Sequence, residues 1–252
     1  MDRWHALLPN WAIFTLLALI VVFNLISYHF QNEIFSNIIS LALIPVLFGI
    51  YFFKQRIMAN VFLTAFLLYF LGIVFTLDDT HILSAKFSES CFLGAYALLI
   101  FVMIGRLKHV KFEGLISWYL IVVVFINAYL MYTMFANVQG NLIDSVLLTL
   151  GIAKGVVLLV MAFLAFAIYL SKESTQSIIF LSMVCCFVFV DVLSFTTDLY
   201  IQYWLFEVFA KTLQGIGLLL LCVYVYNHQS YMNQCHIKED PRPIEKSNQL
   251  TA

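Results

Sequence analysis

Charged residues are scarce in this sequence. Asp, Glu, Lys and Arg make up only 11% of the 252 residues, whereas 63% are hydrophobic. Soluble domains carry about 25% charged residues, and a soluble core of this size needs a polar coat that this composition cannot provide. The scarcity of charge therefore excludes an ordinary soluble domain. The net charge of −1 also lacks the basic excess that nucleic-acid binding requires, so we expect no nucleic-acid partner.

Patterns typical of metal binding are absent as well. The sequence has five cysteines but no CxxC pattern and no Cys/His ligand spacing, and most of the cysteines lie inside apolar runs. Adjacent Cys185 and Cys186 point to different faces of a helix, which favours membrane packing. His81 with Asp78 and Asp79 could form a cluster, but solvated loop charge is the better interpretation. We expect neither a metal nor a cofactor.

Long apolar runs recur from Trp11 almost to Tyr226. Each is close to the roughly 20 residues that a helix needs to cross about 30 Å of hydrocarbon. The runs are continuous rather than alternating, which excludes the strands of a β-barrel. The pattern predicts an all-α, polytopic membrane helix bundle of about eight transmembrane helices. The predicted spans are 11–29, 34–53, 57–77, 88–105, 114–134, 143–170, 176–197 and 203–227.

Basic residues divide unequally between the two sides of this eight-span arrangement. One side, which holds both termini, has ten Lys and Arg residues, and the opposite side has only Lys86. The ten are Arg3, Lys54, Arg56, Arg106, Lys108, Lys111, Lys172, Lys238, Arg242 and Lys246. Basic loops stay in the cytoplasm, so we predict that both termini are cytoplasmic. Residues 1–227 then form the transmembrane domain, and 228–252 a short disordered cytoplasmic tail. The apolar run near the N-terminus has no small-residue cleavage site, so we expect it to remain as the first span.

Ionisable residues inside the spans are the candidate functional groups, because a charge in hydrocarbon costs several kcal/mol unless it is paired or hydrated. Asp191 and Lys154 each lack a partner of opposite charge at helical spacing. Glu207, Lys211 and Gln214 share one face of the last span. We predict that Lys154, Asp191 and Lys211 meet in a polar cavity built by the last three spans. The alternative for Glu207 and Lys211 is a simple ion pair within their own helix.

The second half of the chain resembles a known family. The stretches "KGVVLLVMAFLAFAIY", "VCCFVFVDVLSF" and "FAKTLQGIGLLLL" are similar to the YhhN-like integral membrane proteins, the lysoplasmalogenase family. Met161, Ala165, Asp191 and Gln214 stand at matching places. The first half departs from the family pattern, because Ile73 replaces its first acid and Val190 replaces the serine before its second.

The resemblance implies hydrolysis of the vinyl ether bond of a lysophospholipid, which gives a fatty aldehyde. Such cleavage needs an acid that protonates carbon and a second group that activates water. The resemblance implies Asp191 as the acid, with Asp78 or Asp79 standing in for the missing second acid. The residues expected to bind the lipid are Lys154, Glu207, Lys211 and Gln214.

Two other functions remain open at this point. The same fold could bind a single-chain lipid without chemistry. Alternatively, Asp191, Lys154, Glu207 and Lys211 could exchange partners in a small transporter. The sequence shows no pair of Gly- or Pro-broken helices at matching positions of the two halves, which argues against the transporter. In each case we expect a multi-pass protein of the cell membrane whose partners are membrane lipids.

Overall fold

The computed structural model describes residues 33–54, 60–77, 81–107, 114–138, 144–171, 174–199 and 204–239, together with a few isolated positions before residue 33. Within these ranges the chain is all-helical and contains no strand. The helices are α2 (Glu33–Lys54), α3 (Asn60–Thr76), α4 (Ile82–Leu107), α5 (Gly114–Val138), α6 (Ser145–Ser171), α7 (Thr175–Leu199) and α8 (Trp204–Glu239).

Four of the described helices are long and apolar enough to cross a membrane. These segments are Ile82–Gly105 in α4, Ser145–Ser171 in α6, Thr175–Thr197 in α7 and Leu205–Asn227 in α8. Shorter apolar segments are Leu41–Phe52, Asn60–Thr76 and Val124–Thr133. Length and hydropathy therefore indicate a membrane protein, whose apolar helices suit contact with lipid.

Each predicted span from the second onward overlaps a described helix, and the first, 11–29, falls largely outside the described residues. One boundary was wrong, because helix α4 begins at Ile82 instead of 88, so Lys86 lies in a helix and not in a loop. The last predicted span, 203–227, agrees with the apolar segment Leu205–Asn227. Helix α8 continues beyond that segment to Glu239, into residues that we predicted as a disordered tail. The rest of that tail lies outside the described residues.

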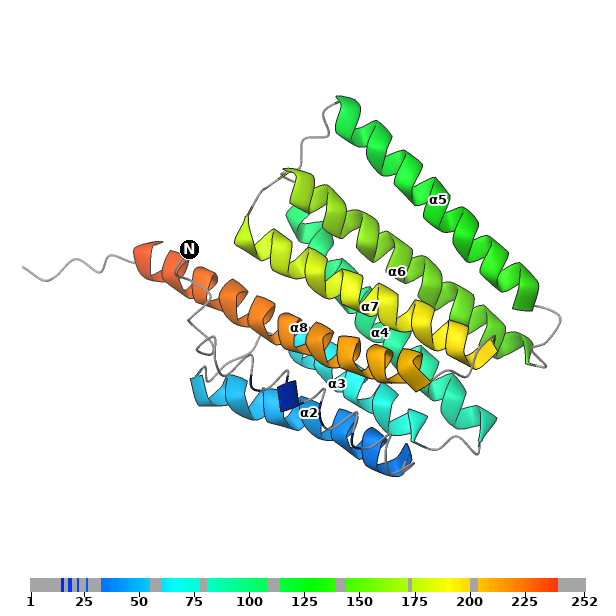
Figure 1. Cartoon of the computed structure of the whole chain (residues 1–252). Helices are drawn as coiled ribbons and strands as arrows, with labels where there is room; N and C mark the ends of the chain where they lie inside the picture. The colour runs from blue at the N-terminus through cyan, green and yellow to red at the C-terminus, as the bar shows by residue number, and fades with distance from the viewer. Residues whose placement is uncertain are drawn as a thin grey trace, which may run out of the picture.

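The helices lie side by side with their axes roughly aligned (Figure 1). Helix α4 packs against α3 on one side and α6 on the other, and α7 packs against α6 and α8. Helix α5 lies at one edge and contacts α6, while α2 lies at the other edge against α8 and α3 (Figure 1). Helices α2, α3, α4, α6, α7 and α8 therefore enclose the interior of the described bundle, to which α2 contributes Ile44, Leu47 and Tyr51.

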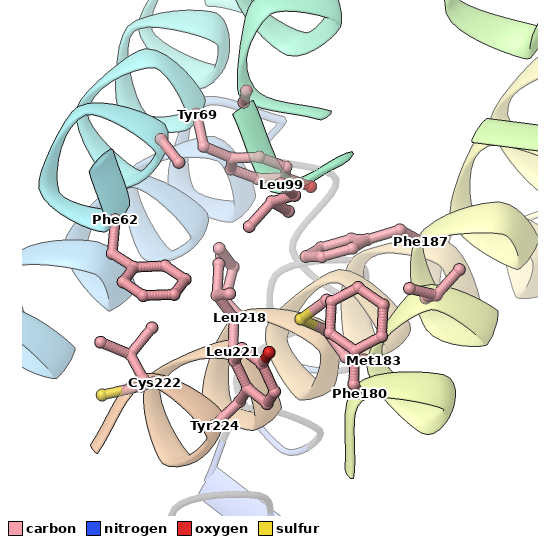
Figure 2. Packing of buried hydrophobic residues seen from close by; sticks show 14 of the residues in the cluster. Phe62, Tyr69, Leu99, Phe180, Met183, Phe187, Leu218, Leu221, Cys222 and Tyr224 are labelled. Carbon is pink, nitrogen blue, oxygen red and sulfur yellow. The ribbon is translucent and has the colours of Figure 1, made fainter. Parts of the chain in front are cut away.

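Aromatic and aliphatic side chains fill the half of the interior that contains the start of α7 and the later part of α8 (Figure 2). Phe180 and Tyr224 are almost fully buried there, with ring centroids 5.2 Å apart. The Tyr224 hydroxyl lies 3.6 Å from the sulfur of Met103. This half of the interior is consequently packed as a core.

The backbones of α3 and α4 approach closely near their connecting turn. Ser88 donates a hydrogen bond to the Gly72 carbonyl at 3.0 Å, and Ser84 donates to the Phe75 carbonyl at 2.7 Å. A Cβ atom at Gly72 would lie 2.8 Å from the ring of Phe92, so this position needs glycine. Such serine and glycine contacts are typical of helices that associate within a membrane. They fix the register that places the α4 side chains described below.

Candidate functional site

Three charged side chains from three helices meet in one cluster. The Lys154 ammonium, on α6, lies 2.7 Å from Glu89 Oε2 on α4 and 3.0 Å from Asp191 Oδ1 on α7. It also donates a hydrogen bond to Glu89 Oε1 at 2.9 Å. The exposed fractions of the three side chains are 15% for Lys154, 26% for Glu89 and 20% for Asp191, so the cluster is largely removed from the surface. We call these three residues the charged cluster.

The charged cluster lies at one depth in the bundle. Glu89 is seven residues into α4, Lys154 nine residues into α6, and Asp191 eight residues from the end of α7. Since a helix rises about 1.5 Å per residue, each lies about 10–14 Å from its nearer helix end. Because neighbouring helices alternate in direction, these ends belong to the same end of the bundle. The cluster thus lies between the surface and the centre of a bilayer about 30 Å thick.

The two carboxylates are held differently. Asp191 is engaged at both oxygens, because Oδ1 pairs with Lys154 and Oδ2 accepts a hydrogen bond from the Tyr96 hydroxyl at 3.2 Å. Glu89 meets the same ammonium with both of its oxygens, because Lys154 Nζ lies 2.9 Å from Oε1 and 2.7 Å from the buried Oε2.

The charges of the cluster do not cancel. Two carboxylates and one ammonium sum to −1 when all three groups are ionised, and one added proton makes the cluster neutral. A net charge in an apolar surrounding is costly. Two carboxylates around one ammonium are the kinds of group that general acid–base chemistry uses.

Aromatic rings surround the cluster on its inner side. Phe187 lies one turn before Asp191. Its ring centroid is 5.5 Å from that of Tyr69 and 5.7 Å from that of Tyr96. The Lys154 ammonium lies 5.9 Å from the centroid of the Phe92 ring. A Cβ atom at Gly217 on α8 would come within 2.9 Å of the Phe187 ring, so glycine permits this packing. Rings and charges together form a site that is apolar on one side and charged on the other.

A second ion pair lies outside the cluster, at the same end of the bundle. Asp144 precedes α6, accepts a hydrogen bond from the Val146 backbone N–H at 2.9 Å, and pairs with Lys86 at 2.6 Å. The hydrogen bond from Lys86 and that from the backbone hold the pKa of Asp144 below its ordinary value. Asp144 is thus a helix cap and the partner of Lys86.

Lys154 and Asp191 meet as predicted, and Glu89 from α4 joins them. Lys211 pairs with Glu207 one turn away on α8, at 2.7 Å, which is the alternative that their spacing offered. The charged cluster is built by α4, α6 and α7, and α4 supplies the member that the sequence did not single out. The sequence indicated Glu89 only indirectly. Lys154 has no acid at helical spacing on its own helix, so it requires an acidic partner from another helix.

The remaining predicted site residues are placed as follows. Gln214 lies near the cluster but interacts with the Tyr69 hydroxyl. Asp78 and Asp79 lie outside the described residues. No group of His, Cys, Asp and Glu among the described positions could hold a metal ion. A hollow of about 560 Å³ at the α3–α4 turn is lined by residues that include Phe75 and His81, and the charged cluster does not line it.

Comparison with protein-family models, with curated proteins and with solved structures found no match to this chain. The similarity to the YhhN-like family therefore depends on the short motifs described above.

Proposed function

We propose that this chain is a multi-pass protein of the cell membrane, with eight spans and both termini in the cytoplasm, that hydrolyses the vinyl ether bond of a lysoplasmalogen-type lysophospholipid. The observation that carries the proposal is the pair of carboxylates that share Lys154. Their nearest oxygens can be no further apart than the sum of 2.7 and 3.0 Å. The motifs that resemble the lysoplasmalogenase family support the substrate class.

The reaction assigns separate roles to the two acids. Protonated Glu89 gives its proton to the outer carbon of the vinyl ether, and an oxocarbenium ion forms. Asp191 takes a proton from water as that water attacks the oxocarbenium carbon. The hemiacetal then collapses to the aldehyde and the glycerophospho alcohol, and its hydroxyl proton goes to the departing oxygen. The proton on Asp191 returns to Glu89 within the cluster.

These roles differ from the expectation from sequence, which gave the acid role to Asp191. The difference comes from Lys154 and Tyr96, which engage both Asp191 oxygens and leave them as acceptors. In the proposed mechanism Glu89 supplies the acid that the family has at the position of Ile73. Asp78 and Asp79 are then not needed for the chemistry.

The activity can be tested by mass spectrometry of the purified protein in lipid nanodiscs. We expect fatty aldehyde from a lysoplasmalogen and none from its saturated ether counterpart, because only the vinyl ether can be protonated at carbon. Saturable binding of the lysoplasmalogen without aldehyde would instead support a lipid-binding protein. Uptake of a solute into proteoliposomes driven by a proton gradient, again without aldehyde, would support the transporter.

The topology can be tested separately with reporters fused to the C-terminus. The ten-to-one distribution of basic residues predicts that a reporter active only in the cytoplasm is active and that a reporter requiring export is silent. Fusions within the segment between α5 and α6 should give the opposite result. The reverse pattern at the C-terminus would contradict the proposed orientation.

A further inference from the structure

We propose that Tyr96 is a positioning residue that orients the Asp191 carboxylate as the base, and that Tyr69 and Gln214 hold Tyr96 in place. The inference rests on the proposed function for the role of Asp191. It adds Tyr69 and Tyr96, which the sequence did not single out, and it gives Gln214 a role different from the lipid contact predicted for it.

Tyr96 controls one of the two Asp191 oxygens. Its side chain is only 2% exposed, and its hydroxyl donates to Oδ2 while Lys154 pairs with Oδ1. A carboxylate that is anchored at both oxygens by groups on different helices cannot turn about its terminal bond without losing one of them. Tyr96 therefore fixes the plane of the carboxylate and the direction from which it can accept a proton from water.

Tyr69 extends this arrangement away from the charged cluster. Its side chain is 3% exposed, and its hydroxyl interacts with the side chains of Gln214 and Tyr96. Its ring lies 6.3 Å from that of Tyr96. The hydrogen-bonded series thus passes from α7 through α4 and α3 to α8. A buried series of this kind is rigid when each member has a partner, so Tyr96 is held in its donating position.

The ionisable groups placed around Asp191 by the packed helices are few. Lys154 comes from α6, Tyr96 from α4 and Tyr69 from α3, while Glu89 from α4 shares the same lysine. On α8 the nearest participant is the neutral Gln214, through Tyr69. Removal of the Tyr96 hydroxyl therefore eliminates one hydrogen-bond donor to Asp191 and leaves the neighbouring charged side chains in place.

The first test uses Tyr96→Phe in the full chain, in nanodiscs supplied with lysoplasmalogen. We expect kcat to fall about tenfold to a hundredfold with KM unchanged, since a misplaced catalytic group slows the reaction without weakening lipid binding. Tyr224→Phe is the matched control, because it also removes a buried tyrosine hydroxyl but at the opposite end of the bundle. The unfolding temperatures of the two variants should be similar, and kcat of the control should match that of the unaltered chain.

The second test does not depend on turnover. Infrared spectroscopy follows the carboxylate band of Asp191, which is assigned as the band lost in Asp191→Asn. In Tyr96→Phe this band should shift in frequency, because the carboxylate has lost the hydrogen bond from the Tyr96 hydroxyl. An unchanged band would overturn the positioning role. Absence of aldehyde from the unaltered chain would overturn only the hydrolase proposal, and the infrared spectrum would still decide the role of Tyr96.

Discussion

Replacement of Lys154 by methionine is expected to destabilise the bundle more than any other single change in the charged cluster. Methionine matches the length of lysine but leaves Glu89 and Asp191 together with no cation between them. Removal of one partner from a buried ionic group typically costs about 3–5 kcal/mol, because the remaining charge is uncompensated. We expect Lys154→Met to lower the yield of folded protein and the unfolding temperature in detergent, both measurable by fluorescence-detected size-exclusion chromatography.

Two further variants test whether the loss of stability comes from the uncompensated charges of the cluster. Lys86→Met removes a lysine at the same end of the bundle, but Asp144 then keeps its hydrogen bond from the Val146 backbone and no second carboxylate shares this lysine, so the effect should be smaller. The triple variant Glu89→Gln, Lys154→Met, Asp191→Asn removes all three charges and should recover most of the lost stability. If Lys154→Met were as stable as Lys86→Met, compensation within the cluster would be negligible and the charge argument would fail.

Asp191→Asn is expected to lose at least about a hundredfold in turnover while the protein remains folded. Unlike Lys154→Met, this substitution leaves no uncompensated charge in the cluster. After this substitution Lys154 still pairs with Glu89, and the pair is neutral. Glu89→Gln leaves the neutral pair of Lys154 and Asp191, so it should also fold and should also lose activity. Aldehyde release from lysoplasmalogen measures both effects.

Asp144→Asn serves as the matched control for these two variants. Asn caps a helix as well as Asp, so the start of α6 should be preserved, and Asp144 lies outside the charged cluster. Its turnover should equal that of the unaltered chain. A folded Asp191→Asn protein with full turnover would show that Asp191 serves only to pack the helices, in which case Asn would substitute through its own hydrogen bonds.

The sequence predicted the helices well, because long apolar runs identify helices without reference to the rest of the fold. Asp191 and Lys154 were found for a related reason, since each has a high cost of burial and no partner on its own helix. Glu89 was missed because the predicted span began at residue 88, which made this acid look like a residue at a helix end. The structure places it seven residues into α4, where it needs a partner.

Tyr69 and Tyr96 could not be recognised from the sequence. A tyrosine in an apolar run packs equally well as a core ring or as a hydrogen-bond donor, and only the position of its hydroxyl distinguishes the two. That position depends on the α3–α4 register, which the Ser88–Gly72 contact helps to set. A partner of Lys211, in contrast, could be predicted from the sequence, because Glu207 lies four residues before it on the same helix.

The packed half of the interior places the proposed chemistry toward one face of the membrane. Phe180, Tyr224 and their neighbours fill the bundle on the side away from the charged cluster. In the proposed orientation the cluster lies toward the outer leaflet. A lipid would then arrive and its aldehyde depart through that leaflet, so the chemistry would alter the composition of one leaflet and leave the other untouched.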